Sequence, residues 1–166
     1  MGLRRLTESD EPQALLAHRE LAAEDFTMLL GWSPERTWPQ YLRLLQQHRH
    51  GLELEPGHVP ATFLIAGVGE DLVGRVSIRH ELNDFLVEFG GHVGYAVQPQ
   101  FRRRGHATEI LRQALIIGRS EGVERVLVTC DDDNAASQRA IERCGGVLED
   151  VRLTANGRRT KRYWIG

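Results

Sequence analysis

The segment Val97–Thr108, with the sequence VQPQFRRRGHAT, decides the fold of this chain. Before it, residues 92–97 have the β-branched and aromatic content of a short strand. After it, apolar or small residues recur with the spacing of one helix face, at positions 107, 110, 111, 114, 115 and 118. The segment is therefore predicted to join a strand to the N-terminus of a helix, through a turn that contains Pro99 and Gly105.

This predicted junction has the physical properties of a phosphate-binding loop. Free backbone N–H groups and the positive end of the helix dipole converge at a helix N-terminus. Gly105 lets a phosphate approach the main chain, small Ala107 keeps that approach open, and Arg102 to Arg104 add positive charge. The Walker pattern and the G-x-G-x-x-G fingerprint are both absent here, so neither of those nucleotide-binding loops is expected.

A second strand–helix junction follows in the sequence. Residues 125–130 read as a buried strand, and the polar run DDDNAAS occupies positions 131–137. The next helix is predicted to continue to about Cys144 and to stop at Gly145-Gly146, a typical helix C-terminus.

These two junctions resemble the motifs of one family. Arg102-x-x-Gly105-x-Ala107 is similar to the Q/R-x-x-G-x-G/A pyrophosphate motif of the GNAT N-acetyltransferases, which bind acetyl-coenzyme A. Asn134 to Gly146 is similar to the N-x-x-S/A…G-F/G segment of the same family, and the matched motifs span about residues 92–148. Residues 79–95 and 145–149 look like those of a bacterial subgroup of predicted acetyltransferases with no assigned acceptor. The resemblance implies direct transfer of an acetyl group from acetyl-coenzyme A to a primary amine.

The resemblance also implies where the cofactor binds. The pantetheine arm should lie between the fourth and fifth strands, with a backbone N–H near Tyr95 polarising the thioester and Asn134 holding the arm from the far side. The residues expected to bind the cofactor are Tyr95, Ala96, Val97, Arg102, Arg103, Arg104, Gly105, His106, Ala107, Thr108, Asn134 and Ser137.

The group that stabilises the leaving thiolate departs from the usual pattern. Many relatives carry a tyrosine four residues before the helix-ending glycine, where this chain has Ile141. Ser137 lies one helical turn earlier and matches the serine given this role in ribosomal-protein N-terminal acetyltransferases. The alternative is a serine that only fits a tight helix–strand contact, and Tyr163 and Tyr95 are further candidates.

His92 is the first candidate for the base that takes the proton from the acceptor amine. It begins the strand that should present the thioester, and an imidazole has an intrinsic pKa near ~6.5. The alternative is a buried structural histidine bonded to the Gly90-Gly91 turn. Glu81, Asp84 and Glu88 are other candidates, which could also bind a cationic acceptor. Thr129 occupies a position where some relatives keep a catalytic glutamate.

The composition narrows the class of protein further. The 166 residues are predicted to form one domain, residues 1–166, with 41% hydrophobic and 27% charged residues. A formal net charge of −2 argues against nucleic acid or an anionic membrane as partner. No run of residues could span a bilayer or act as a secretion signal, so a cytoplasmic protein is expected. Cys130 and Cys144 are expected to be reduced core thiols, and no metal site is expected.

The expected fold is α/β, in the element order β-α-α-β-β-β-α-β-α-β-β. Strands are predicted at 3–6, 62–68 and 72–78, helices from about 9 to 23 and from 38 to 50, and a polar connection over 79–91. As a GNAT fold, the chain should form a mixed, mostly antiparallel sheet of six or seven strands, with helices on both faces and a splay between the fourth and fifth strands. The expected partner is a small-molecule or peptide amine, and a homodimer is an allowed assembly. The rival function is a non-catalytic coenzyme A sensor or binding module.

Overall fold

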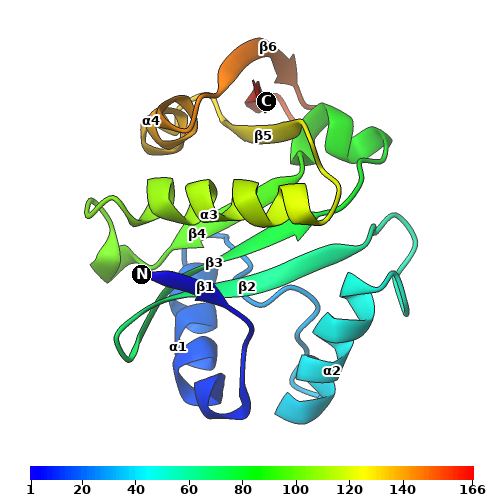
Figure 1. The fold of residues 1–166 in the computed structure, drawn as a ribbon, viewed down its shortest axis with the longest axis vertical. Coiled ribbons are helices and arrows are strands. Elements are labelled where there is room, and N and C mark those ends of the chain that lie inside the picture. The colour runs from blue at the N-terminus through cyan, green and yellow to red at the C-terminus, as the bar shows by residue number, and fades with distance from the viewer.

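A computed structural model describes residues 1–166 as a seven-stranded mixed sheet with helices on both faces (Figure 1). The strand order is β1-β2-β3-β4-β5-β7-β6, and only the β4–β5 pair is parallel. The strands are β1 Gly2–Arg4, β2 Ala61–Val68, β3 Asp71–Arg79, β4 Val93–Val97, β5 Val126–Asp131, β6 Val147–Leu153 and β7 Arg159–Ile165. The helices are α1 Glu11–Ala22, α2 Trp38–Arg49, α3 His106–Ser120 and α4 Ala135–Arg143, with short turns η1 Glu8–Asp10, η2 Leu86–Gly90 and η3 Pro99–Phe101. The predicted fold class is confirmed.

The helices begin where the sequence signals place them. Thr37 caps α2 in a reciprocal box, in which the Thr37 N–H donates to Gln40 Oε1 at 2.8 Å. Asp10 ends η1 and accepts the backbone N–H and the hydroxyl of Thr7, both at 2.7 Å. Both α1 and α2 carry a proline in the first turn, where no N–H partner is needed. None of the helices combines the length and the apolar character that a membrane-spanning segment needs.

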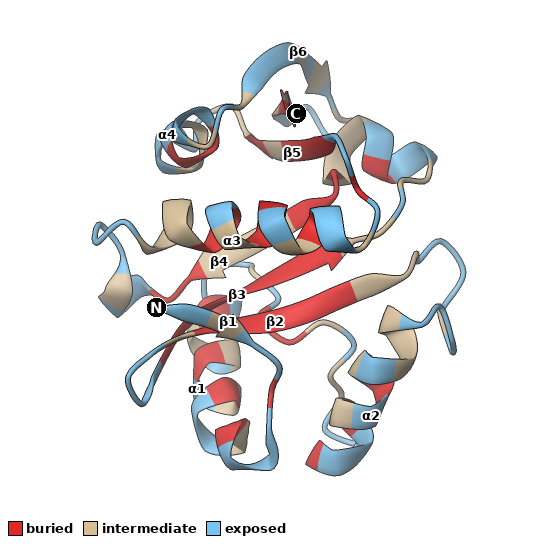
Figure 2. Ribbon diagram, in the orientation of Figure 1, coloured by how far each residue is buried: buried red, intermediate tan, exposed pale blue.

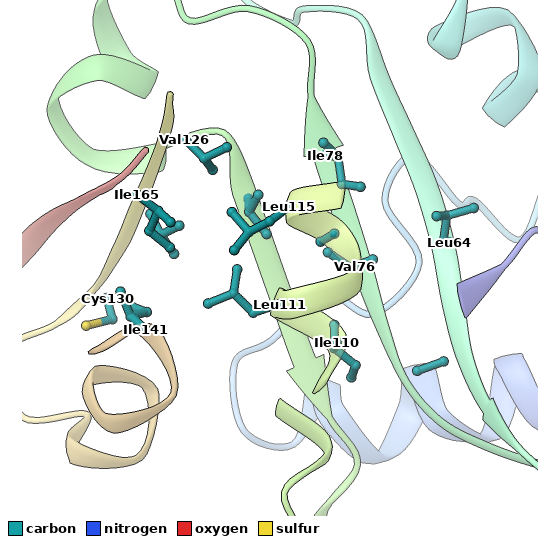
Figure 3. Close-up of a cluster of buried hydrophobic side chains, with 14 of the residues drawn as sticks. Leu64, Val76, Ile78, Ile110, Leu111, Leu115, Val126, Cys130, Ile141 and Ile165 are labelled. Atoms are coloured by element: carbon teal, nitrogen blue, oxygen red, sulfur yellow. The ribbon is translucent and has the colours of Figure 1, made fainter. Parts of the chain in front are cut away.

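Two hydrophobic clusters hold the layers together. α1 and α2 cover one face of the sheet and α3 covers the other (Figure 1). β2 and β3 are buried along most of their lengths because both of their faces are covered (Figure 2). On the α3 face, Leu111 and Leu115 lie among side chains from β3, β5, α4 and β7 (Figure 3). α3 therefore joins both halves of the sheet.

The sheet is open between β4 and β5. These strands pair only at Val93 and Val128, whereas β4 pairs with β3 over five residues. Arg79 N–H donates to the His92 carbonyl, so even-numbered residues of β4 turn their backbone groups toward β3. Tyr95 therefore turns its N–H and C=O toward β5, past the last bridge. Residues 94–96 are half-buried although the strand is central, which agrees with the predicted splay.

The connection between β3 and β4 is more ordered than the sequence predicted. It contains η2, a π-helical turn whose last bond runs from Gly91 N–H to the Leu86 carbonyl at 2.7 Å. A side chain at Gly91 would place its Cβ 2.6 Å from the Leu127 carbonyl oxygen, and Gly91 has φ 63°. Glycine thus allows η2 to pack against β5, and the local sequence pattern does not predict this contact.

Candidate active site

A cleft of about 840 Å³ lies at the open edge of β4. The end of α1 and the connection after it form one side, and the loop before α3 and helix α4 form the other. Eleven of the twelve residues expected to bind the cofactor line this cleft. They are Tyr95, Ala96, Val97, Arg102, Arg103, Gly105, His106, Ala107, Thr108, Asn134 and Ser137.

The loop before α3 has the geometry of an anion-binding turn. Gly105 caps the helix with φ 80°, and Arg103 is also left-handed at φ 61°. Glu109 N–H makes the first helical bond, to the Gly105 carbonyl at 3.2 Å, so the N–H groups of residues 106–108 precede the ladder. A Cβ at Gly105 would have no atom within 4 Å. The loop therefore presents free donors next to open space, with the positive end of the helix dipole behind them.

The arginines at the mouth differ in their availability. Arg102 is engaged, because its Nε donates to the Val97 carbonyl at 3.0 Å and its Nη2 lies 2.5 Å from Glu24 Oε2. Arg104 lies over the Phe101 ring at 5.9 Å and, unlike the other residues expected to bind the cofactor, does not line the cleft. Arg103 lines the cleft and has no ion-pair partner.

Helix α4 adds two basic residues that the sequence reasoning missed. Arg139 and Arg143 line the cleft, are exposed, and pair with no carboxylate. They are four residues apart and so share one helix face. That spacing after Asn134 was the signal that could have found them. With Arg103, they make the mouth of the cleft suited to a polyanion.

A pair of hydroxyl groups spans the splay. Tyr95 Oη and Ser137 Oγ are 2.7 Å apart, so a hydrogen bond links β4 to α4. Asn134 Oδ1 accepts the Ser137 N–H at 3.0 Å and fixes the first turn of α4. Burial raises the pKa of Tyr95 to about 12, so the phenol keeps its proton at neutral pH. Ile141 is fully buried in the core.

His92 is placed differently from the expectation. It is buried, and its Nδ1 accepts the Leu127 N–H at 2.9 Å. The one lone pair of the neutral ring is thus engaged, and the other nitrogen carries the hydrogen. Burial, with a smaller effect of the Arg79 charge, lowers the pKa of His92 to about 4. This geometry argues against His92 as the base and favours a structural role, with β5 rather than the Gly90-Gly91 turn as its partner.

The acidic candidates before β4 are not brought to the cleft either. Glu81 and Asp84 are exposed and lie outside the lining, and Glu88 is 3.5 Å from Arg152. The Thr129 hydroxyl donates to the Phe89 carbonyl at 2.8 Å. Tyr163 is buried in the core and does not line the cleft.

Three other carboxylates do line the cleft. Glu24 pairs with Arg102 and Asp131 pairs with Arg158, whereas Asp25 has no ion-pair partner. Asp25 lies in the connection after α1 with φ 57°. The sequence reasoning missed it because that connection has no periodic pattern.

The comparisons with known proteins agree with this description. A family model described as an acetyltransferase (GNAT) domain matches residues 1–147, so the chain belongs to the GNAT acetyltransferases, an enzyme family of the acyltransferase class. No curated protein matches the chain in sequence.

Several solved structures share the fold. A ribosomal-protein-alanine N-acetyltransferase from Brucella melitensis is 19% identical, with a TM-score of 0.68 over 99% of this chain and 99% of that one. A ribosomal α-N-protein acetyltransferase solved in complex with coenzyme A is 19% identical, with a TM-score of 0.67 over 98% and 92%. A mutant of the spermidine N-acetyltransferase from Vibrio cholerae is 16% identical, with a TM-score of 0.66 over 99% and 94%.

Proposed function

We propose that this acetyltransferase binds acetyl-coenzyme A in the cleft and transfers the acetyl group directly to a primary amine of a small molecule or a protein N-terminus. The observation that carries the proposal is the cleft itself. It joins an open strand edge at Tyr95 to a helix N-terminus with free N–H donors at residues 106–108. Cys130 and Cys144 lie outside the cleft lining, so no cysteine is available there to carry the acetyl group.

The residues of the cleft fit each part of the cofactor. The N–H groups of residues 106–108 would bind the pyrophosphate, and Arg103, Arg139 and Arg143 would neutralise its charge. Asn134 uses its Oδ1 to cap α4, which leaves its amide N–H groups free to donate to the pantetheine arm. Bound acetyl-coenzyme A would supply an activated thioester, and the Tyr95 N–H at the open edge would donate to its carbonyl oxygen.

The Tyr95–Ser137 pair would protonate the leaving thiolate. A serine hydroxyl is a weak acid on its own. When Tyr95 donates to Ser137 Oγ, the serine proton becomes easier to transfer, and the phenol proton can follow it. Ser137 would thus take the place of the tyrosine that Ile141 replaces.

Asp25 would accept the proton of the acceptor ammonium, directly or through one water. It is the cleft carboxylate without an arginine partner, so its charge is available. Asp25→Asn is expected to lower kcat/KM about 10²-fold while coenzyme A binding is unchanged. An unchanged pH–rate profile in this variant would remove Asp25 from the mechanism.

One screen tests the proposed activity. Thiol release from acetyl-coenzyme A is measured over a panel of amines, peptides and aminoglycosides. Turnover with any of them supports the transferase. Coenzyme A binding without turnover on any of them supports the alternative, a non-catalytic acyl-coenzyme A binding module, which Ile141 at the usual tyrosine position favours.

We also propose a cytoplasmic location, because Cys130 and Cys144 are free thiols, as expected in a reducing compartment.

A further inference from the structure

Two arginines of β3, one buried and one half-buried, lie on the face covered by α1 and α2 without a carboxylate partner. Arg75 is 4% exposed, and its guanidinium donates to the carbonyls of Gly94 at 2.8 Å and Thr27 at 2.9 Å. Its Nε is buried and makes no hydrogen bond. Arg79 is half-buried and donates from Nη1 to the carbonyls of Gly90 and Gly91, both at 3.0 Å. Neither residue forms an ion pair.

Arg162, another buried arginine of this chain, has carboxylate partners. The Arg162 side chain is 5% exposed and contacts two carboxylates, Glu149 at 2.5 Å and Asp150 at 2.7 Å. Burying a charge without an opposite charge is costly. For Arg75, burial and the neighbouring Arg79 charge lower the pKa to about 10. Unbalanced positive charge is thus concentrated at one place on this face of the sheet.

That place adjoins the candidate reaction centre. A Cβ at Gly94 would lie 3.7 Å from Arg75 Nη1 and 3.7 Å from Arg79 Nη2, so the missing side chain leaves both guanidinium groups facing the accessible part of β4. Arg79 Nη2 has no hydrogen-bond partner in the protein. Gly94 directly precedes Tyr95, whose hydroxyl contacts Ser137. Strand alternation places the two arginines on the opposite face from the Tyr95 side chain.

The cleft also reaches this face of the sheet. Ala96 and Phe26 line it, Ala96 pairs with Arg75 across the strands, and the Phe26 ring lies 4.6 Å from the Arg75 guanidinium. Neither arginine lines the cleft itself, and Arg75 lies beneath the Phe26 ring, so an acceptor bound against Phe26 and Ala96 would lie next to Arg75 without contacting it. Arg79 is the more exposed of the two, and its Nη2 is the group that a carboxylate on this face could reach.

We infer that the acceptor carries a carboxylate close to its reacting amine, and that Arg79, supported by Arg75, binds this carboxylate. The inference rests on the proposed function and names its substrate class. Two sources share the chemistry: a free amino acid, and a peptide whose first residue is Asp or Glu. Cationic acceptors such as spermidine are repelled at the same position.

Matched acceptor pairs test the inference. Each L-amino acid is compared with its α-amide, and the dipeptides Asp-Ala and Glu-Ala with Asn-Ala and Gln-Ala, alongside spermidine. The amine of an α-amide loses its proton more easily than that of the free acid, so intrinsic reactivity favours the amide. We expect at least one carboxylate acceptor to exceed its amide partner in kcat/KM by about tenfold or more, as for one charge-assisted contact. The two sets of pairs distinguish the amino acid from the peptide.

Two variants test whether Arg79 causes the preference for carboxylate acceptors over their amides. Arg79→Gln should abolish the preference by raising KM for the carboxylate acceptor, with kcat nearly kept. Arg19→Gln, which removes an exposed charge on the same side of the sheet, should preserve it. The inference is overturned if every amide equals or exceeds its acid, if spermidine is the best acceptor, or if Arg79→Gln affects acids and amides equally.

A binding measurement separates this inference from the proposed function. The same pairs are titrated calorimetrically into protein saturated with coenzyme A. Selective binding of acids that depends on Arg79, without thiol release, would support the anion site and contradict the transferase. Thiol release without discrimination in either assay would support the transferase and contradict the anion site.

Discussion

At the scale of single residues, the hydroxyl pair of Tyr95 and Ser137 connects the two elements on either side of the open seam, β4 and α4. Tyr95 belongs to the strand whose edge is open, and Ser137 belongs to the first turn of α4. In the proposed mechanism, their 2.7 Å contact lets the two hydroxyls act together as the proton donor.

Ser137→Ala is expected to lower kcat by roughly 10²–10⁴-fold with little change in coenzyme A affinity, because a positioned proton donor is lost. Tyr95→Phe should give a smaller loss of kcat, because the serine remains. Steady-state kinetics and calorimetry on both variants measure these effects. Ser120→Ala, which removes an exposed hydroxyl on α3, serves as the control. A kcat of Ser137→Ala within a few-fold of the parent would leave the serine with a packing role only.

His92 is expected to affect stability rather than the pH–rate profile. Its folded pKa of about 4 lies below the unfolded value near 6.5, so the stability it provides is present above pH 6.5 and is lost as pH falls toward 4. The loss should reach about 2–3 kcal/mol at the lower end of this window. Urea unfolding between pH 7 and 4 measures it.

Two substitutions separate the hydrogen bond from the charge. His92→Asn keeps an acceptor for the Leu127 N–H, whereas His92→Leu leaves that buried donor unpaired and should cost about 1–3 kcal/mol more. Both variants should lose the pH dependence above pH 5. If either one removes a pKa from the kcat/KM profile while coenzyme A still binds, His92 returns to the mechanism.

At the scale of elements, the strand–helix junctions were predictable and the contacts between elements were not. The helical spacing after Gly105 and the glycines after Cys144 are local signals, so α3 and α4 were predicted together with the residues that line the cleft. His92 could not be assigned in the same way, because its partner Leu127 lies thirty-five residues away. η2 was missed because its packing depends on the close approach of Gly91 to β5.

The N-terminus of α3 gives a prediction with a built-in control. Gly105 and Gly122 both have positive φ and open space around them, but only Gly105 lines the cleft. Alanine at either position should cost about 1 kcal/mol of stability because of the left-handed backbone. Gly105→Ala should also weaken coenzyme A binding, and Gly105→Val should abolish it. Thermal unfolding and calorimetry compare the variants. Equal coenzyme A affinity in Gly105→Val and Gly122→Ala would place the phosphates elsewhere.

At the scale of the whole molecule, the order of elements predicted a mixed sheet with helices on both faces, and the resemblance to the GNAT family predicted the opening between the fourth and fifth strands. The site was only partly predictable because one side of the cleft comes from the connection after α1, where Asp25 and Phe26 follow no repeating pattern. The sequence gives no sign that Arg75 and Arg79 of β3 lack a carboxylate partner, and only the structure shows that no carboxylate faces them.

The ion pair between Arg102 and Glu24 connects the two sides of the cleft. Both side chains are more than 40% exposed, so the pair contributes less than about 1 kcal/mol. Glu24→Gln should free Arg102 and remove a negative charge from the mouth, so coenzyme A should bind a few-fold more tightly at low salt, with the gain reduced at high salt. Glu35→Gln makes the same charge change away from the cleft and should have no effect. Weaker binding in Glu24→Gln would mean that the pair organises the loop.

The single bridge between Val93 and Val128 has a mechanical consequence. Strands β1–β4 form one antiparallel plate and β5–β7 form another, and α3 packs across the seam between them (Figure 3). A pantetheine arm that hydrogen-bonds to Tyr95 and to α4 at the same time would link the two plates and restrict their twisting against each other. Coenzyme A in the cleft should therefore reduce the motion of β5 and β7, including residues that do not contact the ligand. Slower amide exchange in β5 and β7 on coenzyme A binding would register it.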